Sequence, residues 1–275
     1  MVRLEAVERA TARADYARDG WYAPGTGLDP ALLDSVRHSI EEMSRMERPE
    51  VVYEAGSRTV RALHGCHRYN DVCARLIRHP LLVDLAETLL GEEVYVYQFK
   101  VNIKSPREGK QWPWHQDYAF WAREDGMPTP NAVSIAINID DVHEHNGPLT
   151  VLPGSHRHDL IDASKPPEPA GRETWHAHVS AKLSHTVPDA RVRRLTEECG
   201  TTTLVGPAGT LIAFHPNLVH SSSDNLSPDR RAVLLITYNA VRNAPTRLTR
   251  PDFLVDPDTT RVRPMAWDGP EADDD

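Results

Sequence analysis

Residues 93–104 read EVYVYQFKVNIK, and this stretch decides the fold class because its hydrophobicity changes at every second residue. A two-residue period is that of a β-strand, in which successive side chains point to opposite faces. The period places Gln98, Lys100 and Asn102 on one face. The opposite face is expected to carry Tyr97, Phe99, Val101 and Ile103. The stretch therefore predicts a strand with one polar and one apolar face.

Other segments have the length and composition of strands and are separated by turns rich in Gly, Pro, Asn and Asp. They are AVSIAINI (132–139), GPLTVLPG (147–154), GTLIAFH (209–215) and RRAVLLITYNAV (230–241). Several short strands with few helices between them are typical of a β-barrel or jelly roll. We therefore predict a mainly β fold with flanking helices.

Helical periodicity is confined to the first third of the chain. Residues from about 5 to 46 carry helical spacing with turn signals near Pro24 and Pro30, which predicts two or three helices. The segment HPLLVDLAETLLGEE predicts an amphipathic helix that begins near Pro80 and ends at Gly91. We expect one domain over residues 1–275, with a mainly helical part (1–92), a β core (93–156 and 200–245), an insert or lid (157–199) and a tail (246–275).

The segment 157–199 differs from the strands around it. It is rich in Pro, His and charged residues and has no sustained period. A loop of this length within a compact domain is often a lid or binding loop, and a partly disordered insert is the alternative.

The charge of the chain favours small-molecule chemistry. Its 31 basic and 40 acidic residues give a formal net charge of −9, which opposes nonspecific binding to nucleic acid or to anionic membranes. The charged N-terminus lacks the apolar run of a signal peptide, and no segment reaches the roughly 20 apolar residues of a membrane span, so we expect a cytoplasmic protein. Cys66, Cys73 and Cys199 form no CxxC pair and are expected to be reduced and structural.

A metal-binding pattern occurs in WPWHQDYAFWAREDGMP (112–128). Residues two apart on a strand point the same way, so His115 and Asp117 are expected to present an imidazole and a carboxylate to one point. His220 follows a predicted strand about a hundred residues later and is the candidate third ligand. Two histidines and one carboxylate leave open positions on a six-coordinate metal, which is the arrangement used by Fe(II) oxygenases.

Arg231 offers the cation that such a site needs. If 2-oxoglutarate chelates the iron, its far carboxylate needs a bidentate partner, and the planar guanidinium of arginine suits it. Arg231 begins the strand predicted after His220 and is expected to point inward, whereas Arg230 is expected to point outward. A surface strand end is the alternative for this pair.

Other residues were weighed for binding roles. Arg61 is a candidate to bind the carboxylate of an amino-acid substrate, with surface or structural pairing as the alternative. The aromatic residues near His115 either form dry walls around the metal or pack in the core; they are Trp112, Trp114, Phe120 and Trp121. Three His-x-His pairs have spacing compatible with zinc binding but lack a third ligand at a familiar spacing. These pairs are His143/His145, His156/His158 and His176/His178.

Several phrases together resemble a known family over residues 58–245. They are SRTVRAL, YQFKVNIK, WPWHQDYAFWAREDGMP, NGPLTVLPGSH, HPNLVHSSSDNLSP and RAVLLITYNAVRNAP. The chain resembles the phytanoyl-CoA dioxygenase-like Fe(II)/2-oxoglutarate oxygenases, which include ectoine hydroxylase and free amino-acid hydroxylases of natural-product pathways. Among these, the leucine-type hydroxylases have the closest phrases.

The resemblance implies a double-stranded β-helix, of the jelly-roll or cupin type, and assigns residues to three roles. It implies His115, Asp117 and His220 as iron ligands and Arg231 as the partner of the 2-oxoglutarate carboxylate. By motif position it implies further contacts to 2-oxoglutarate from Asn102, Ser134, Ser222 and Trp112. It implies Gln98 and Trp121 as substrate contacts. The chain departs from the family mainly in the N-terminal helices and in residues 157–199, which puts the identity of the substrate in doubt.

The implied reaction uses Fe(II), 2-oxoglutarate and O2, with ascorbate as an in vitro reductant, and releases succinate and CO2. The leading hypothesis is hydroxylation of an unactivated carbon of a small free amino acid by a monomer or homodimer. The presence of Asp117 favours hydroxylation over halogenation, whereas desaturation and cyclisation use the same residues. The alternatives are an oxygenase of another small metabolite, such as an ectoine-like compound, and a non-catalytic cupin-like binding protein.

Overall fold

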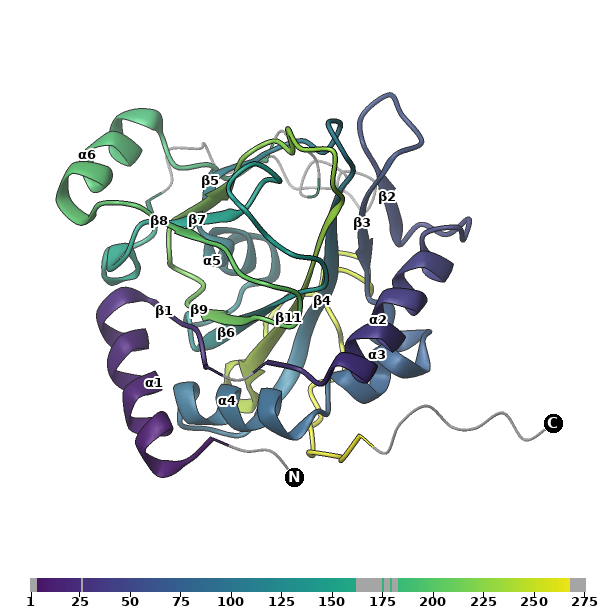
Figure 1. Cartoon of the computed structure of the whole chain (residues 1–275). Helices are drawn as coiled ribbons and strands as arrows, with labels where there is room; N and C mark the ends of the chain where they lie inside the picture. The colour runs from purple at the N-terminus through teal and green to yellow at the C-terminus, as the bar shows by residue number, and fades with distance from the viewer. Residues whose placement is uncertain (1–3, 26, 162–174, 176–178, 180–182, 268–275) are drawn as a thin grey trace.

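A computed structural model describes residues 4–25, 27–161, 175, 179 and 183–267 (Figure 1). The helices are α1 (Ala6–Asp19), α2 (Pro30–Met43), α3 (Asp71–Leu76), α4 (Pro80–Leu90), α5 (Asp117–Phe120) and α6 (Asp189–Cys199), with short turns η1 (Cys66–Arg68), η2 (Trp121–Asp125), η3 (Ser155–Arg157) and η5 (Val241–Asn243). The strands are β1 (Trp21–Tyr22), β2 (Val51–Tyr53), β3 (Val60–His64), β4 (Val94–Lys104), β5 (Trp112–His115), β6 (Ala132–Asn138), β7 (Leu149–Val151), β8 (Thr202–Leu204), β9 (Leu211–Phe214), β10 (His220–Ser222) and β11 (Arg231–Ala240).

Two antiparallel sheets form the body of the molecule. The larger has seven strands in the order β1-β9-β6-β11-β4-β3-β2, and the smaller has four in the order β5-β10-β7-β8. Long strands of the larger sheet, β4 and β11, pair along their whole length from Val94/Ala240 to Lys104/Arg231. The mainly β fold with flanking helices is confirmed, and the strands predicted from 93–104, 132–139, 147–154, 209–215 and 230–241 are all present.

The helices cover the outer face of the larger sheet. Side chains of α1, α2, α3 and α4 join one apolar core with the outward residues of β4, β6 and β11, and Figure 1 shows α1 and α4 along one edge of the molecule. Helix α4 begins with Pro80 in its first turn and ends at Gly91, which adopts the left-handed conformation (φ 71°) that favours glycine. These helix boundaries agree with the sequence prediction.

One part of the predicted face pattern of β4 is wrong. Phe99, Val101 and Ile103 pack in the core beneath the helices, as expected. Tyr97 instead packs with Trp121 on the inner side. The register explains the difference: Thr237 of β11 pairs with Gln98 and Tyr238 pairs with Val96, so Tyr97 is an extra residue in a β-bulge. A bulge places two successive side chains on one face, which a two-residue period cannot anticipate.

Strands and strand contacts also occur in the N-terminal part and in the segment after residue 245. The first 92 residues contain three strands, β1, β2 and β3, in addition to their helices. The segment predicted as a tail crosses back over the sheet, where Asp256 donates its backbone N–H to Tyr97 and Val262 donates its own to Val94. The division of the chain into a core, an insert and a tail stays a prediction, and most of the insert before Leu183 lies outside the described residues.

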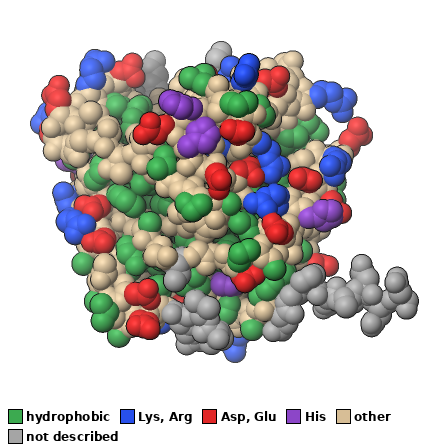
Figure 2. All heavy atoms as spheres, viewed as in Figure 1, with side chains coloured by type: hydrophobic (Ala, Val, Ile, Leu, Met, Phe, Trp, Pro, Cys, Tyr) green, Lys and Arg blue, Asp and Glu red, His purple; other side chains and the backbone are tan. Residues whose placement is uncertain are grey.

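Within the described ranges no helix is long and apolar enough to cross a membrane. On the face drawn in Figure 2, basic and acidic side chains are interspersed rather than gathered by sign.

Candidate active site

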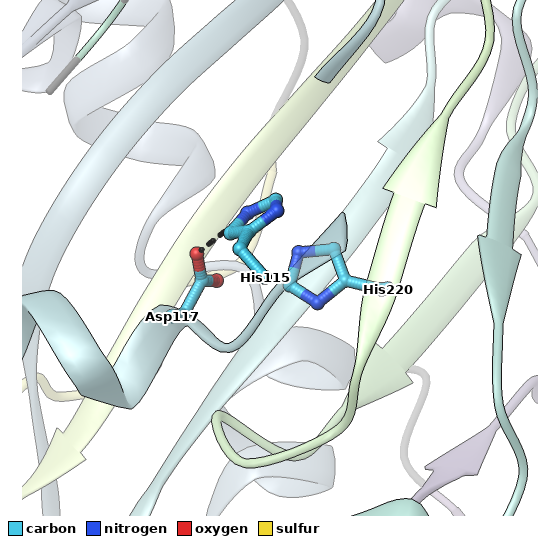
Figure 3. A group of neighbouring side chains, drawn as sticks. All are labelled: His115, Asp117 and His220. Atoms are coloured by element: carbon cyan, nitrogen blue, oxygen red, sulfur yellow. Dashed lines mark ion pairs between the residues drawn. The ribbon is translucent and has the colours of Figure 1, made fainter. Parts of the chain in front are cut away.

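His115, Asp117 and His220 converge between the two sheets (Figure 3). His115 is the last residue of β5, Asp117 is the first of α5, and His220 is the first of β10. His115 and His220 face each other across the β5–β10 pair. One nitrogen or oxygen atom from each of the three lies within 4.8 Å of the others, and all three side chains are buried.

The route by which Asp117 reaches this point differs from the prediction. We expected His115 and Asp117 on one strand, but the strand ends at His115 and the helix begins at Asp117. The turn is fixed where Tyr118 donates its backbone N–H to the Pro216 carbonyl at 3.0 Å and Ala119 donates to Gln116. The two side chains still meet, with His115 Nε2 3.6 Å from Asp117 Oδ1.

Both imidazoles are oriented by backbone carbonyls. His115 Nδ1 lies 2.6 Å from the Pro113 oxygen, and His220 Nδ1 lies 2.9 Å from the Leu218 oxygen. A carbonyl oxygen only accepts a hydrogen bond, so each Nδ1 carries a proton. Each Nε2 is thereby left free to coordinate a metal, as is usual when the other ring nitrogen of a histidine donates to a carbonyl.

The electrostatics of the three residues suit a cation. Burial alone would raise the pKa of Asp117, but the Lys100 ammonium and the two histidines hold it well below its usual range. Burial and the neighbouring His115 lower the pKa of His220 to about 3. The site therefore presents an ionised carboxylate and a neutral imidazole, the forms that bind metals. Among the described residues, Asp117 Oδ2 has no hydrogen-bond partner although it is buried.

Strand β4 runs along an elongated pocket that contains the three residues. Gln98, Lys100 and Asn102 all line this pocket. Lys100 lies 3.8 Å from Asp117, which places the triad beside the middle of the strand. At about 3.4 Å per residue, the part of β4 that lines the pocket, from Gln98 to Asn102, spans about 14 Å. The pocket therefore has two ends on either side of the triad.

Two buried basic side chains, Lys104 and Arg231, lie beside one end of the pocket. Arg231 and Lys104 face each other across the β11–β4 pair. The Arg231 guanidinium donates to the Gly147 carbonyl, and Lys104 Nζ donates to Ser222 Oγ at 2.7 Å and to the Ser223 carbonyl. Burial and the nearby Arg231 lower the pKa of Lys104 to about 6. In the described chain Arg231 Nε has no hydrogen-bond partner, so the site has unused capacity to bind an anion.

The other residues expected at this end fall into two groups. Asn102, Ser222 and Trp112 line the pocket, and buried Asn102 Oδ1 has no partner among the residues described. Ser134 is fully buried, and its hydroxyl lies 3.0 Å from that of Thr237. The pocket lining on its strand consists of Ala136 and Asn138 instead.

Gln98 and Trp121 also line the pocket, and their role as substrate contacts stays a prediction. Trp121 is buried with its ring against Tyr97, and Gln98 donates from Nε2 to the Leu254 carbonyl at 2.8 Å. Phe120 and Leu254 complete the apolar lining there. Trp112, Phe120 and Trp121 thus form walls of the pocket, and Trp121 also belongs to a core cluster.

Arg61 is engaged within the protein. Its guanidinium pairs with Glu54 at 3.0 Å, donates to the Val179 carbonyl at 3.1 Å and stacks over the Trp112 ring at 3.9 Å. Arg61 does not belong to the residues that line the pocket. Structural pairing, the alternative left open by the sequence, is the arrangement observed.

Sequence reasoning missed several residues around the pocket. Arg250 and Leu254 line it from the segment predicted as a tail, where no motif marks them. Lys104 was detectable, because it continues the polar face of β4 two residues after Asn102. His64, at the end of β3, also lines the pocket.

Within the described chain, the triad is the one cluster of three potential metal ligands. The His145 backbone N–H donates to His143 Nδ1 at 3.3 Å. His156 Nε2 lies 3.2 Å from the Ala17 carbonyl oxygen. His176 and His178 lie outside the described residues.

The chain matches the family model for phytanoyl-CoA dioxygenase (PhyH) over residues 16–233. The protein belongs to the phytanoyl-CoA dioxygenase family. This result confirms the resemblance inferred from the sequence. The matched residues include the triad, Lys104 and Arg231. The pocket walls come from the two sheets or from segments packed against them.

Named relatives of this phytanoyl-CoA dioxygenase family member are enzymes. It is 54% identical over 258 residues to L-proline trans-4-hydroxylase from Streptomyces griseoviridis, covering 94% of this chain and 96% of that protein. It is 34% identical over 233 residues to ectoine dioxygenase from Bordetella bronchiseptica, covering 83% and 74% respectively. The chain is therefore an enzyme of the dioxygenase class.

The fold of this family member matches a solved enzyme. The structure of EctD from S. alaskensis with 2-oxoglutarate and 5-hydroxyectoine superposes with a TM-score of 0.80 at 28% identity, covering 96% of this chain and 88% of that one. Another structure of the same protein, with bound Fe, superposes with a TM-score of 0.78. These matches confirm the jelly-roll core.

Proposed function

We propose that the protein hydroxylates an unactivated carbon of a small free amino acid in an Fe(II)- and 2-oxoglutarate-dependent reaction, with L-proline as the first candidate substrate. The observation that carries the proposal is the 54% identity to L-proline trans-4-hydroxylase over 94% of this chain. The pocket supports it, because a triad of two histidines and one carboxylate lies between a cationic end and a partly aromatic end.

His115, Asp117 and His220 are the proposed iron ligands. Two imidazoles and one carboxylate match the donor set of non-haem Fe(II) oxygenases. The carbonyls of Pro113 and Leu218 fix both Nε2 atoms toward the centre, and the unpartnered Asp117 oxygen gives the cation an anionic ligand. The residues present therefore fit the metal that the family implies.

Arg231 and Lys104 are proposed to bind the far carboxylate of 2-oxoglutarate. Two buried basic side chains that face each other across a strand pair suit an anion, because a bound carboxylate favours their charged forms. A carboxylate accepts several hydrogen bonds at once and pairs well with a guanidinium. Asn102, Ser222 and Trp112 line the same end and are proposed as further contacts, and Ser134, on the inner face of β6, is proposed to act through its hydrogen bond with Thr237.

The bound iron and 2-oxoglutarate supply the oxidising power that places one oxygen atom of O2 on the substrate and releases succinate and CO2. The chain's own contribution is to position the substrate and to keep the pocket dry. Phe120, Trp121 and Leu254 exclude water from the substrate end. Gln98 is held toward the pocket by the Leu254 carbonyl. Arg61 is proposed to support Trp112 rather than to reach the substrate directly.

A mass-spectrometric assay tests this function. The purified protein is incubated with Fe(II), ascorbate, 2-oxoglutarate, O2 and L-proline, and both succinate and a gain of one oxygen atom are measured. Stoichiometric formation of succinate and hydroxyproline is the expected result. Failure to oxidise proline or any other free amino acid would contradict the proposal.

A second candidate substrate is an ectoine-like cyclic compound, because the chain is 34% identical to an ectoine dioxygenase and superposes on EctD. Ectoine added to the same assay distinguishes the two. We further propose that the enzyme acts in the cytoplasm, as a monomer or homodimer, in a natural-product pathway. Subcellular fractionation and light scattering test the first two points.

A further inference from the structure

His64 is a buried histidine of the pocket to which neither the sequence motifs nor the reaction assigned a role. It is the last residue of β3 and lies directly opposite Lys100 in the antiparallel β3–β4 pair. Side chains of directly opposed residues share a face and lie about 4.5–5.5 Å apart at Cβ. His64 therefore belongs to the inner face that also carries Gln98 and Lys100, and all three line the pocket.

The free atom of this ring is Nε2. It is buried, and among the residues described it has no hydrogen-bond partner. A buried polar atom without a partner costs about 1–3 kcal/mol, so an unpaired atom on a pocket wall indicates a ligand that pairs with it. The amide of Gln98 differs, because its nitrogen is already bonded to the Leu254 carbonyl.

The surroundings of His64 favour an anionic partner. Burial, together with the cationic Lys100 and Arg250, lowers the pKa of His64 to about 3, so its ring is neutral. The charged groups whose fields reach the ring are thus both cations. Their own partners are Asp117 for Lys100 and Asp125 for Arg250. The charges that lower the pKa of this ring are both positive, and such charges attract a carboxylate and oppose the ammonium group of an amino acid.

We infer that His64 is a substrate-recognition residue whose Nε2–H donates a hydrogen bond to the carboxylate of the amino-acid substrate. This inference rests on the proposed function, because it takes a free amino acid as the substrate. It also gives the substrate a direction, with the carboxylate against β3 and β4 and the side chain toward the aromatic wall of Phe120 and Trp121. The selected class is amino acids with a free carboxylate.

The test compares two variants and two probes. His64→Phe keeps the ring volume and removes the donor, whereas His64→Gln keeps a donor nitrogen near the position of Nε2. L-Proline and L-prolinamide are the probes, and steady-state KM and kcat are measured for each with succinate as the readout. Calorimetry of L-proline binding to the anaerobic Fe(II) and 2-oxoglutarate complex gives a readout independent of turnover. His79→Phe is the control, since His79 also has an unpaired Nδ1 among the residues described but does not line the pocket.

His64→Phe is expected to raise the KM and Kd for L-proline by about tenfold to a hundredfold, the range for a hydrogen bond to a charged group. The KM for 2-oxoglutarate should stay unchanged, and His64→Gln should recover most of the loss. The preference of the wild type for proline over prolinamide should shrink in His64→Phe and persist in His79→Phe.

Two results overturn the inference in different ways. If the wild type hydroxylates proline but His64→Phe retains its KM, its Kd and its preference over the amide, the residue does not bind the carboxylate. If the wild type oxidises no free amino acid, the proposed function fails, and the inference falls with it.

Discussion

Arg230 and Arg231 are adjacent in sequence and opposite in environment. The Arg230 guanidinium is part exposed and pairs with Asp140 at 2.9 Å, whereas Arg231 is buried at the pocket. The sequence prediction that one points outward and the other inward is confirmed. The pair therefore offers a matched test at the scale of one side chain.

Arg231→Met is expected to raise the KM for 2-oxoglutarate strongly, because truncating one partner of a buried charge pair costs about 2–5 kcal/mol, or roughly thirtyfold and more in affinity. Arg230→Met should leave this KM near the wild-type value. The measurement is succinate formation as a function of 2-oxoglutarate concentration. Equal effects of the two substitutions would contradict the assignment of Arg231.

We expect Lys104 to make the binding of 2-oxoglutarate dependent on pH. Its pKa is lowered to about 6 by burial and by Arg231, so at about pH 7.5 most of the empty sites hold a neutral amine. A bound carboxylate favours the charged form and raises this pKa, so binding takes up a proton. Because protons are then a reactant, the affinity should fall as the pH rises above about 6.

Calorimetric titration of 2-oxoglutarate in phosphate and in Tris measures this proton uptake, because the two buffers differ in ionisation enthalpy. The anaerobic Fe(II) enzyme should take up close to one proton at about pH 7.5, and Lys104→Met should take up none while binding more weakly. Identical binding enthalpies of the wild type in the two buffers would show that Lys104 does not change its charge.

Motif spacing predicted which side chains come together at the triad. It was less informative about side chains that pair with other residues of the protein. His115, Asp117 and His220 come together as expected because a metal requires particular residue types. The sequence left both substrate binding and structural pairing open for Arg61, and its guanidinium pairs with Glu54 and donates to the carbonyls of Val179 and Gln111. Pairing of this kind depends on tertiary contacts, which a single sequence does not display.

Among the elements, the turn that contains Gly147 closes the cationic end of the pocket. Gly147 has a φ of 81°, and its carbonyl accepts from Arg231. A Cβ at this position would lie 2.7 Å from both Lys104 Cδ and the Ser223 carbonyl oxygen. The turn therefore has no room for a side chain beside Lys104 of β4 and Arg231 of β11.

Gly147→Ala is expected to raise the KM for 2-oxoglutarate about tenfold or more, because displacing a binding group by even 1 Å is costly. Gly56→Ala is the control: Gly56 has a similar φ of 74° with no atom within 4 Å of an added Cβ. Both variants carry the left-handed strain of about 1–2 kcal/mol, which thermal unfolding should report. Only Gly147→Ala should alter cosubstrate kinetics, and an equal change in both would refute the steric explanation.

The long elements were predictable and the short ones were not. Strands β4, β6 and β11 carry clear alternation, and α4 carries both a proline start and a glycine end. Strand β10 has three residues and α5 has four, too few to show a period. Their positions are set by hydrogen bonds to distant segments, such as that from Tyr118 to Pro216.

At the scale of the whole molecule, the three proposed metal ligands connect the two sheets. His115 and His220 lie on paired strands of the smaller sheet, and Asp117 lies beside Lys100 of the larger sheet. A cation bound by all three would stabilise the native state and not the unfolded chain. The sequence predicted one domain, and this arrangement leads us to expect that the two sheets unfold together.

We therefore predict a single thermal transition whose midpoint rises when metal binds. A ligand at about 100 times its Kd contributes about 2.7 kcal/mol, which corresponds to an increase in Tm of roughly 5–10 °C for a domain of this size. Differential scanning calorimetry with and without Ni(II), a redox-inert substitute, measures the shift. His115→Ala should lose it, and two separate transitions would contradict a single cooperative domain.

The bulge at Tyr97 affects how this chain must be aligned with its relatives. After the extra residue, even-numbered residues of β4 face inward, whereas before it odd-numbered residues do. Deleting Tyr97 would leave continuous pairing in which Val96 still faces the helices and Tyr95 still faces inward, whereas a substitution keeps the extra residue. Alignments that close this position without a gap would therefore compare side chains from opposite faces of the sheet.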